Sequence, residues 1–505
     1  MGKVYLVGAG PGDPGLITVR GLECIRKAET LIYDYLASPS LLDAAPGGCE
    51  RIYVGKKGGD HTLPQKEINA LILKKAREGK IVTRLKGGDP FIFGRGGEEA
   101  EVLAEAGIPF EIVPGVSSAV AAPAYAGIPL THREFTSTVG FVTGHEDPTK
   151  DESSIDWKAL ARGMGTLVFL MGVKNLPRIV SKLMENGLSG KTPIALIQWG
   201  TTPGQVTVSG TLETIEGIAR KNRIGAPAII CIGGVVSLRE KLNWFESKPL
   251  FGKRILVTRA REQASDLVRA LSELGGQCLE IPTIRIAPPE DKTLLEDAVA
   301  RLNEYHWIIF TSVNGVSAFF NELFLNGKDA RALGSIKTAV IGPATQKRLL
   351  DYGIKSDILP ESYRAESIIA AFSHENINGK KILIPRAKEA RMILPAELQK
   401  LGGAVHEVAA YRTISSGETP EFLVRHLKEK KIDLITFTSS STVKNFKDLL
   451  SQADLDSLIK NVTIASIGPI TTETAQRLGF TVQITADTFT IPGLVDAICR
   501  YYRNK

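Results

Sequence analysis

The chain has 505 residues, a formal net charge of +7, 43% hydrophobic residues and 23% charged residues, which is typical of a folded protein with several domains. No apolar run reaches the length of a membrane span, aromatic residues make up only 7% of the chain, and Lys and Arg are not massed in blocks, which argues against a membrane protein and against a nucleic-acid binder. The five cysteines and seven histidines show no metal-ligand spacing. We therefore expect a cytoplasmic protein without a metal site or a disulfide framework.

The first half of the chain alternates short apolar runs with helical patterns. Helices are predicted over Thr18–Ala28 and Pro64–Glu78, between runs of strand length. This alternation of strand and helix predicts an α/β fold with a mainly parallel sheet. The strand-length runs are Lys3–Val7, Thr30–Tyr33, Arg51–Val54, Ile81–Leu85 and Phe110–Val113.

A second group of strand-like runs follows the segment Pro114–Ala119, which we interpret as a hinge or linker. Its connections are less regular, which favours a mixed sheet. The pattern breaks near Lys241–Gly252, so we expect a first domain over 1–246, with subdomains of about 1–113 and 120–246, and a linker over 247–252. The strand-like runs are Thr138–Thr143, Gly165–Met171, Pro193–Gln198, Gln205–Gly210 and Pro227–Ile232.

The second half contains an internal repeat of three ordered matches. The offsets between the matching segments are 127, 127 and 126 residues. A period of this length indicates a duplicated α/β lobe rather than a solenoid, and a cleft between two such lobes is a favoured place for a ligand. The matches are 254–260 with 381–387, 307–312 with 434–439, and 339–345 with 465–471.

The loop Arg84–Glu99 has the composition of a ligand-binding segment. It follows a predicted strand and holds five glycines and a proline, residues that let a backbone approach a ligand closely. Asp89 lies in its tightest part, where a carboxylate suits a ribose hydroxyl or an amine better than a phosphate. An ordinary glycine-rich surface turn is the alternative. The earlier loop Val7–Gly15 lacks dinucleotide-binding spacing, because Asp13 stands where a third glycine is needed.

Ten motifs occur in order through the first half: Val7–Thr18, Tyr33–Asp34, Val54–Lys56, Arg84–Glu99, Pro114–Ala119, Gly127–Arg133, Val142–His145, Met171–Gly172, Gly200–Thr201 and Gln205. Together they closely resemble uroporphyrinogen-III C-methyltransferase. The resemblance implies two α/β domains with S-adenosylmethionine in the cleft between them, in a protein that is usually a homodimer through this half. It further implies a cofactor site lined by Pro11, Gly87, Gly88, Asp89, Ile92, Ser117, Ser118, Met171, Gly200 and Ala228.

The same resemblance implies acid–base candidates at Asp34 and Lys56. Methyl transfer to a pyrrole carbon depends on in-line positioning, and a proton must then leave the pyrrole, for which a carboxylate beside a lysine is suited. A helix cap for Asp34 and a solvated loop charge for Lys56 are the alternatives. The family's substrate carries eight carboxylates, so candidate partners, or else surface ion pairs, are Arg95, His132 and Arg133.

Short motifs of the second half resemble uroporphyrinogen-III synthase: Val257–Arg259, Thr311–Gly315, Ile341–Pro343, Pro385–Arg386, Tyr411–Thr413, Thr436–Ser439 and Ile467–Thr472. The resemblance implies a two-lobed α/β fold with exchanged segments. One lobe is expected from 253–287 plus 414–505 and the other from 290–411. The joining segments Cys278–Pro288 and Val405–Ser415 are themselves a repeat pair, which predicts a two-stranded connector.

The synthase substrate is the linear hydroxymethylbilane, which loses water and closes with inversion of its last ring. Tyr411 is placed by the resemblance at the cleft tyrosine that assists the departing hydroxyl, with packing of an aromatic side chain on a lobe as the alternative. Arg259 and Arg386 occupy matching repeat positions suited to an anion, or to one ion pair in each lobe. Hydroxyl and amide donors for the carboxylates are expected at Ser312, Thr438, Ser439, Thr471 and Thr472.

The sequence thus predicts a bifunctional enzyme of tetrapyrrole biosynthesis. Its second half is expected to make uroporphyrinogen III, and its first half to methylate that product twice, giving precorrin-2 for sirohaem or cobalamin. Two alternatives stay open at this point. The first half methylates another corrinoid precursor, or the second half is a two-lobed ligand-binding module without catalytic activity.

Overall fold

The computed structural model describes residues 2–55, 63–144, 155–258, 261–281, 284–360, 365–388, 393–415, 420–450 and 455–503. The chain forms two compact units, Met1–Lys253 with Leu274–Gln277, and Arg254–Glu273 with Cys278–Lys505. Among the described residues, no helix combines the length and the apolar character that crossing a membrane requires.

The first sheet of the first unit is parallel throughout, as predicted. Its order is β3-β2-β4-β1-β5, and each predicted run becomes a strand to within one residue. Since all strands run the same way, their carboxyl ends and the loops that follow them share one edge. The strands are β1 (Lys3–Gly8), β2 (Thr30–Tyr33), β3 (Glu50–Tyr53), β4 (Ile81–Lys86) and β5 (Phe110–Val113).

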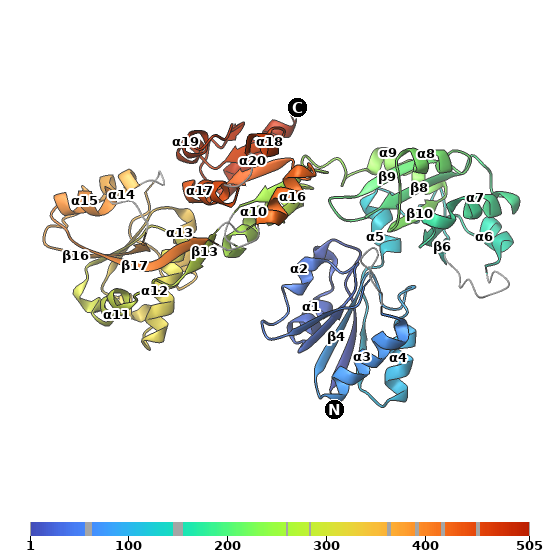
Figure 1. The fold of residues 1–505 in the computed structure, drawn as a ribbon, viewed down its shortest axis with the longest axis horizontal. Helices are drawn as coiled ribbons and strands as arrows, with labels where there is room; N and C mark the ends of the chain where they lie inside the picture. The colour runs from blue at the N-terminus through green and yellow to red at the C-terminus, as the bar shows by residue number, and fades with distance from the viewer. Residues whose placement is uncertain are drawn as a thin grey trace. The chain divides into compact units, whose positions relative to one another are not determined.

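Helices cover both faces of this sheet. Helices α1 (Val19–Arg26) and α2 (Pro39–Leu42) lie on one face, and α3 (Gln65–Arg77) and α4 (Gly96–Glu105) lie on the other (Figure 1). Side chains of β1 alternate between them, so that Leu6 packs with α3 and α4 while Val7 packs with α1 and α2. Burial on both faces explains why these strands read as continuous apolar runs.

The second sheet of this unit is mixed, also as predicted. Strands β6 and β7 are parallel, and β7, β10, β8 and β9 pair antiparallel in that order. The irregular part of the segment interpreted as a hinge is shorter than Pro114–Ala119, because Ser118 already begins α5, whose first turn is capped by Ser117. The strands are β6 (Val139–Thr143), β7 (Thr166–Leu170), β8 (Pro193–Gln198), β9 (Val206–Thr211) and β10 (Ala228–Ile232).

Two layers of helix enclose the mixed sheet. Helix α5 and the short turn η3 pack on one face, and α6, α7 and α8 pack on the other. The helix bounds are α5 (Ser118–Tyr125), α6 (Trp157–Gly163), α7 (Leu176–Glu185), α8 (Ile215–Lys221), η3 (Gly234–Leu238) and α9 (Arg239–Leu242).

The second unit holds two further five-stranded sheets that exchange segments. Strand β11 matches β16 in the sequence repeat, yet β11 pairs with β18 while β16 pairs with β14. The first strand of each repeat therefore completes the sheet of the other. The orders are β12-β11-β18-β19-β20 and β13-β17-β16-β14-β15. The strands are β11 (Arg254–Val257), β12 (Gln277–Glu280), β13 (Ile284–Ala287), β14 (Trp307–Phe310), β15 (Lys337–Val340), β16 (Lys381–Ala387), β17 (Ala404–Ser415), β18 (Leu434–Phe437), β19 (Thr463–Ser466) and β20 (Ile484–Thr485).

Strands β13 and β17 form the antiparallel pair that joins the two lobes, from Ile284 opposite Ser415 to Ala287 opposite Arg412. The sequence assigns 284–287 to the first lobe, but β13 is bonded as an edge strand of the second lobe's sheet. The position of β13 differs from the prediction because β17 is twelve residues long and extends beyond β16. The extension of β17 is the part with which β13 pairs.

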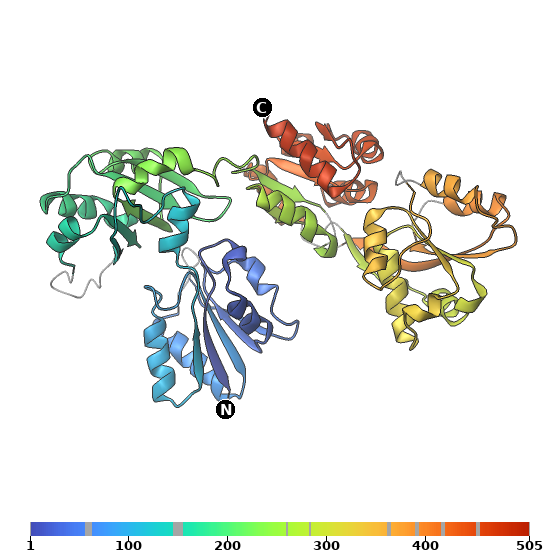
Figure 2. The same ribbon diagram turned by 180° about the vertical axis from the view of Figure 1, so that it is seen from behind.

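Helices again cover both faces of these sheets. In the second lobe, α11, α12 and α13 pack on one face and α14 and α15 on the other, which Figure 2 shows from behind. The α-helices of the two lobes together are α10 (Arg261–Glu273), α11 (Thr293–Ala300), α12 (Val313–Leu325), α13 (Pro343–Leu350), α14 (Ala365–Phe372), α15 (Ile393–Lys400), α16 (Pro420–Lys428), α17 (Ser440–Leu449), α18 (Leu455–Ile459), α19 (Pro469–Arg477) and α20 (Ile491–Arg503).

Candidate active sites

Three glycines bring three loops into backbone contact at the carboxyl edge of the first sheet. Gly8 ends β1, Gly88 follows β4, and Gly115 follows β5. A Cβ on Gly8 would lie 2.5 Å from the Cα of Gly115 and 2.6 Å from the carbonyl oxygen of Gly88, and a Cβ on Gly115 would lie 2.5 Å from that same oxygen. No side chain can yield there, so this junction requires glycine at both positions.

Asp89 ties the same loops together. One carboxylate oxygen accepts the backbone N–H of Phe91 at 2.8 Å, and the other accepts the N–H of Gly115 at 3.0 Å. Gly88, with φ of +72°, exchanges backbone hydrogen bonds with Gly10. Each carboxylate oxygen can accept a second hydrogen bond, so Asp89 fixes the loop and still retains capacity for a ligand hydroxyl or amine.

The second subdomain meets these loops at residues that the resemblance predicts. A Cβ on Gly88 would lie 3.8 Å from the amide nitrogen of Ser118, the first residue of α5. Within the second subdomain, a Cβ on Gly200 would lie 2.4 Å from the Cβ of Ala122 in the same helix. Backbone-lined surfaces of this kind fit a small ligand whose polar groups bond to amides and carbonyls, as S-adenosylmethionine would.

A hydrogen-bonded link that the sequence did not reveal joins the two subdomains. The Tyr125 hydroxyl donates to the Asp13 carboxylate at 2.7 Å, and the Asp13 N–H donates to Thr201 Oγ1 at 3.1 Å. Burial, then the hydrogen bond to Asp13, raises the pKa of Tyr125, so the hydroxyl keeps its proton and stays a donor. Asp13 belongs to the loop after β1, which also holds Pro11, so this link anchors one of the loops predicted to bind the cofactor.

The remaining predicted cofactor residues lie along one edge of the mixed sheet. Ala228 begins β10 and lies opposite Gln198, which is two residues before Gly200. Met171 directly follows β7, the other neighbour of β10. Of the seven non-glycine residues with positive φ in the described part of the chain, five lie in these loops: Phe93, Arg95, Met171, Trp199 and Thr201. Backbone strain of this kind gathers at ligand sites.

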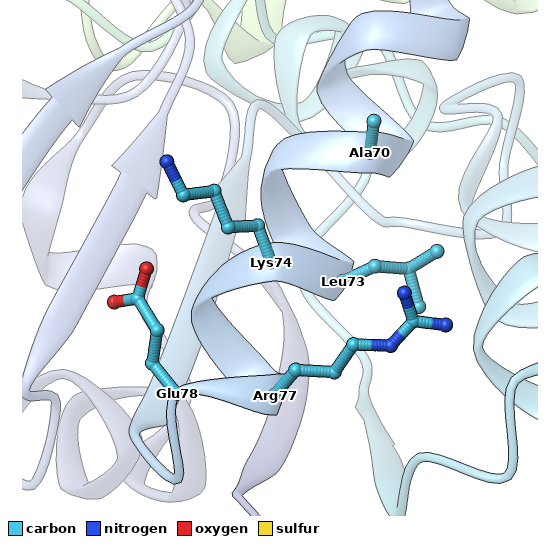
Figure 3. A pocket seen from close by; sticks show the side chains of 5 residues that line it. All are labelled: Ala70, Leu73, Lys74, Arg77 and Glu78. Carbon is cyan, nitrogen blue, oxygen red and sulfur yellow. The ribbon is translucent and has the colours of Figure 1, made fainter.

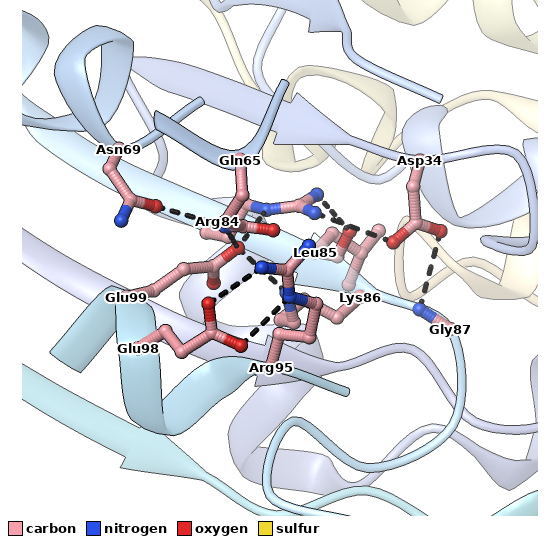
Figure 4. A network of polar contacts seen from close by, with 10 residues as sticks. All are labelled: Asp34, Gln65, Asn69, Arg84, Leu85, Lys86, Gly87, Arg95, Glu98 and Glu99. Carbon is pink, nitrogen blue, oxygen red and sulfur yellow. Dashed lines mark hydrogen bonds and ion pairs between the residues drawn. The ribbon is translucent and has the colours of Figure 1, made fainter. Parts of the chain in front are cut away.

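Asp34 follows β2 and faces the cofactor loop. Its Oδ1 accepts the N–H of Leu36 at 3.2 Å. The same oxygen accepts the N–H of Gly87 at 3.4 Å, and Oδ2 lies 3.5 Å from Arg84 Nη2 (Figure 4). Lys56, the other acid–base candidate, lies outside the described residues. Asp34 thus stands beside the first glycine of the predicted cofactor site.

Beneath Asp34 lies a buried charge cluster that the sequence analysis missed. Glu99 Oε1 is 2.7 Å from Lys86 Nζ and 3.3 Å from Arg84 Nε, and it accepts from Gln65 Nε2 at 3.1 Å (Figure 4). Burial, and next the Arg84 charge, lower the pKa of Lys86, whereas Glu99 raises it. The alternation of Arg84 and Lys86 on one face of a buried strand was the signal, because such cations require a partner.

The three predicted carboxylate partners lie on the surface of the unit. Arg95 makes a bidentate ion pair with Glu98, at 2.8 and 2.7 Å, which is the alternative that the sequence left open. His132 accepts the N–H of Glu134 at its Nδ1, and Arg133 is exposed in the same loop. Ile92 is likewise exposed, in the loop after β4.

Two surface hollows lie apart from these loops. One, of about 480 Å³, is lined by Ala70, Leu73, Lys74, Arg77 and Glu78 along α3 (Figure 3). Another, of about 430 Å³, lies where α7 and α8 approach each other. Neither contains a residue of the predicted site, so the glycine loops and not the hollows define the candidate site.

In the second unit, equivalent serines begin equivalent helices. Ser312 caps α12 and Ser439 caps α17, each at the carboxyl end of a parallel strand. Helix N-termini of this kind present N–H groups and a partial positive charge to carboxylates. The repeat therefore sets one serine-capped helix N-terminus at the end of a strand in each lobe, and Thr438 directly precedes the second.

Tyr411 and Ser312 are brought together from positions 99 residues apart. The Tyr411 hydroxyl lies 2.9 Å from Ser312 Oγ, and the Tyr411 side chain is 8% exposed within the second lobe's core. Tyr411 therefore combines packing with a hydroxyl that reaches the edge where α12 begins.

Other predicted synthase residues have partners of their own. Arg386 is buried and pairs with Glu407 at 2.6 Å, which fits the alternative of an ion pair within the lobe. Thr472 Oγ1 contacts Ser466 Oγ and lies 2.8 Å from Thr485 Oγ1, and Thr471 is buried in α19. Arg259 lies outside the described residues.

Comparison with known proteins assigns the two halves to two families. Residues 3–216 match the model of tetrapyrrole (corrin/porphyrin) methylases, and residues 265–496 match that of uroporphyrinogen-III synthase HemD. The chain is 40% identical to a porphyrin biosynthesis protein HemD of Ruminiclostridium josui, over 98% of this chain and 97% of that protein.

Other relatives match the first half alone. An S-adenosyl-L-methionine-dependent uroporphyrinogen III methyltransferase of Methanosarcina barkeri is 54% identical over 48% of this chain and 95% of its own length. A crystal structure of uroporphyrin-III C-methyl transferase from Thermus thermophilus, complexed with S-adenyl homocysteine, is 39% identical over 47% of this chain and all of that one, with a TM-score of 0.41. This chain therefore belongs to the tetrapyrrole methylases through its first half and to the uroporphyrinogen-III synthases through its second.

Proposed function

We propose that this chain carries out two consecutive steps of tetrapyrrole biosynthesis. The second unit cyclises hydroxymethylbilane to uroporphyrinogen III with inversion of the last ring, and the first unit methylates that product twice to precorrin-2. The observation that carries the proposal is the Ruminiclostridium josui relative, which matches both halves in one continuous alignment. The product of one unit is the substrate of the other, which explains their fusion.

In the first unit, the loops at Gly8, Gly88 and Gly115 hold the cofactor, S-adenosylmethionine, which supplies the methyl group when bound. Their backbone amides and carbonyls, with Asp89, orient it against the acceptor carbon. Asp34 accepts the proton that the methylated pyrrole must lose. Its distance of 3.4 Å from the Gly87 amide nitrogen supports this role, because the base then lies against the loop proposed to hold the methyl donor.

In the second unit, the helix ends at Ser312 and Ser439 bind side-chain carboxylates of the linear substrate, and Tyr411 donates a hydrogen bond to its departing hydroxyl. The hydroxyl takes up a proton and leaves as water when its C–O bond breaks, which gives a cationic azafulvene. The exposed carbon then bonds to the far ring, and the macrocycle returns the proton to solvent. The contact of the Tyr411 hydroxyl with Ser312 supports this assignment, since it directs the phenol toward the anion-binding helix end.

The proposed function is tested with the full chain in two stages. Incubation with hydroxymethylbilane alone is expected to give uroporphyrinogen of isomer type III, and addition of S-adenosylmethionine is expected to convert it to a dimethylated product. Separation of isomers I and III by chromatography reads the first stage, and mass spectrometry reads the second. Type I product alone would contradict the synthase assignment, and an unmethylated product would contradict the methyltransferase assignment.

Changing Tyr411 to Phe is expected to slow ring closure by about a hundredfold, because the variant keeps the packing and loses the proton donor. The rate of uroporphyrinogen III formation measures the effect. Methylation of supplied uroporphyrinogen III by the same variant is the internal control and is expected to be unchanged. Full synthase turnover in Tyr411→Phe would remove this residue from the reaction.

We further propose that the protein acts as a homodimer through its first half, in the cytoplasm. The family resemblance of that half supports the dimer. The five dispersed cysteines, which are all unpaired in the structure, support the reducing cytoplasm. Light scattering of the full chain measures the state directly, and a monomer at micromolar concentration would contradict the dimer.

A further inference from the structure

Thr201 lies in a conformation that its residue type disfavours. Its φ is +71°, in the left-handed region, and its side chain is β-branched. A β-branched residue is rarely found there, and such strain persists only where the surroundings enforce it, most often at a binding or active site. Thr201 is 2% exposed and directly follows Gly200 of the predicted cofactor site. Neighbouring groups must therefore hold Thr201 in this conformation.

Gln205 is the side chain that holds Thr201. Its Oε1 accepts the Thr201 backbone N–H at 2.8 Å, while Thr201 Oγ1 accepts the Asp13 N–H at 3.1 Å. Gln205 Nε2 donates to Glu246 Oε1 at 2.8 Å. A carboxylate only accepts hydrogen bonds and a backbone N–H only donates them, so both neighbours require the same orientation of the Gln205 amide. Gln205 is buried, which keeps water from competing for these bonds.

Glu246 is fixed by an ion pair of its own. Its Oε2 contacts Arg239 Nη2, and both side chains are 14% exposed. Arg239 Nη1 donates to the carbonyl of Ala126 at 2.6 Å, just beyond the end of α5. Arg239 lies in α9, and Glu246 lies in the segment that leads from α9 to the second unit. A chain of hydrogen bonds therefore runs from this segment through Gln205 to the loop at Gly200.

The same segment reaches the loop of Asp13 by a second route. The rings of Trp244 and Phe245 lie 5.0 and 4.8 Å from the ring of Tyr125, measured between centroids. Trp244 Nε1 also donates to the carbonyl of Ala124 at 3.0 Å. The Tyr125 hydroxyl in turn donates to Asp13. Residues 244–246 are thus one side chain away from each partner of the Asp13–Thr201 hydrogen bond.

We propose that Gln205 and Glu246 are positioning residues of the methyltransferase, which hold Thr201 in its left-handed conformation and thereby set the Gly200 loop for S-adenosylmethionine. The inference rests on the proposed cofactor site. Neither side chain has to touch the cofactor, since Gln205 acts through the Thr201 backbone and Glu246 acts through Gln205. The segment that leads to the second unit therefore helps to shape the methyl-transfer site.

The test replaces Gln205 with Met in the full chain, which keeps a similar volume and removes both hydrogen bonds. Titration calorimetry with S-adenosylhomocysteine is expected to show a dissociation constant raised by about tenfold, the usual effect of one lost buried hydrogen bond. The KM for S-adenosylmethionine is expected to rise with it while kcat changes little, because the lost interaction concerns binding. A folding defect alone would lower kcat or the number of binding sites per chain. An unchanged dissociation constant would overturn the proposal.

Thr201→Gly tests whether Gln205 acts through Thr201. Glycine adopts a positive φ without strain, so the loop keeps its conformation without help from Gln205. In the Thr201→Gly protein, Gln205→Met is therefore expected to raise the dissociation constant by less than about threefold, a coupling that a double-mutant cycle measures. An equal factor in both backgrounds would show that Gln205 acts on another group and would overturn the proposed role.

Glu246→Ala is expected to raise the same dissociation constant by about threefold, less than Gln205→Met does, because Gln205 Nε2 also lies 3.4 Å from the Tyr125 carbonyl oxygen. Glu246→Gln keeps an oxygen acceptor and is expected to bind more tightly than Glu246→Ala. The matched control is Glu185→Ala, which removes an exposed carboxylate paired with Lys182 in the same subdomain and is expected to leave the constant unchanged. Should Gln205→Met not fold, the Glu246 comparison decides, and equal affinity of Glu246→Ala and Glu185→Ala overturns the proposal.

Failure of the proposed function gives a different result. An unchanged protein that binds S-adenosylhomocysteine and leaves uroporphyrinogen III unmethylated would contradict the proposed function, while the comparison of dissociation constants would still stand. An unchanged protein that binds no S-adenosylhomocysteine would contradict the cofactor site, and this inference with it.

Discussion

Replacing Gly8 with Ala is expected to weaken binding of S-adenosylhomocysteine by about ten- to a hundredfold, since overpacking of a tight site costs about 1–3 kcal/mol. The added methyl group would lie 2.5 Å from the Gly115 Cα and 2.6 Å from the Gly88 carbonyl oxygen. Both contacts are with backbone, so the loops after β4 and β5 must move apart. Titration calorimetry of the variant with S-adenosylhomocysteine measures the loss.

Gly97→Ala is the matched control for this substitution. Gly97 lies in α4, at the end of the same glycine-rich segment, and a Cβ there meets nothing within 4 Å. Alanine also favours a helix over glycine, so the control is expected to bind the ligand normally and to be at least as stable. Equal affinity in the Gly8 and Gly97 variants would place the cofactor away from the three-glycine junction.

The second large effect is expected for Asp34→Asn, which should lower kcat of methyl transfer by about 10²–10⁴-fold with little change in S-adenosylhomocysteine affinity. An asparagine oxygen can still accept the N–H groups of Leu36 and Gly87. What the variant loses is the negative charge and the ability to take up a proton. The comparison of single-turnover rate with ligand affinity separates catalysis from binding.

The second unit of the same polypeptide is the internal control for Asp34→Asn. Formation of uroporphyrinogen III from hydroxymethylbilane depends on residues of the other unit, so it is expected to proceed at the original rate. A variant that retains full methyl transfer would show that another group takes the proton. A variant that loses both activities would indicate a folding defect instead.

Much of the fold was predictable because strands of a parallel sheet are buried on both faces and therefore appear in the sequence as short apolar runs. Thr30–Tyr33 and Phe110–Val113 are short apolar runs in the sequence and strands with the same bounds in the structure. The end of the hinge predicted at Pro114–Ala119 was set two residues too late, because a proline and a glycine obscure the serine cap that starts α5. Local pattern cannot distinguish a linker from a capped helix start.

The site was predictable where motifs are contiguous and not where distant segments meet. Gly87–Asp89 is a continuous signal, whereas the bond from Tyr125 to Asp13 spans 112 positions and has no local signature. Tyr411 and Ser312 were each singled out, but their contact was not, for the same reason. Arg84 and Lys86 are two cations on one face of a buried strand, a signal that the sequence analysis did not use, and their partner Glu99 could be identified only from the structure.

The exchange of segments in the second unit imposes an order on its synthesis. Ile255 of β11 pairs with Leu434 of β18, so β11 leaves the ribosome about 180 residues before its partner exists. The intervening stretch 284–415 carries every strand of the β13-β17-β16-β14-β15 sheet and can fold as a contiguous insert. During that interval the apolar β11 can pair with β12 along one side only. The side that β18 later covers is an open strand edge that a chaperone or a neighbouring nascent chain would meet.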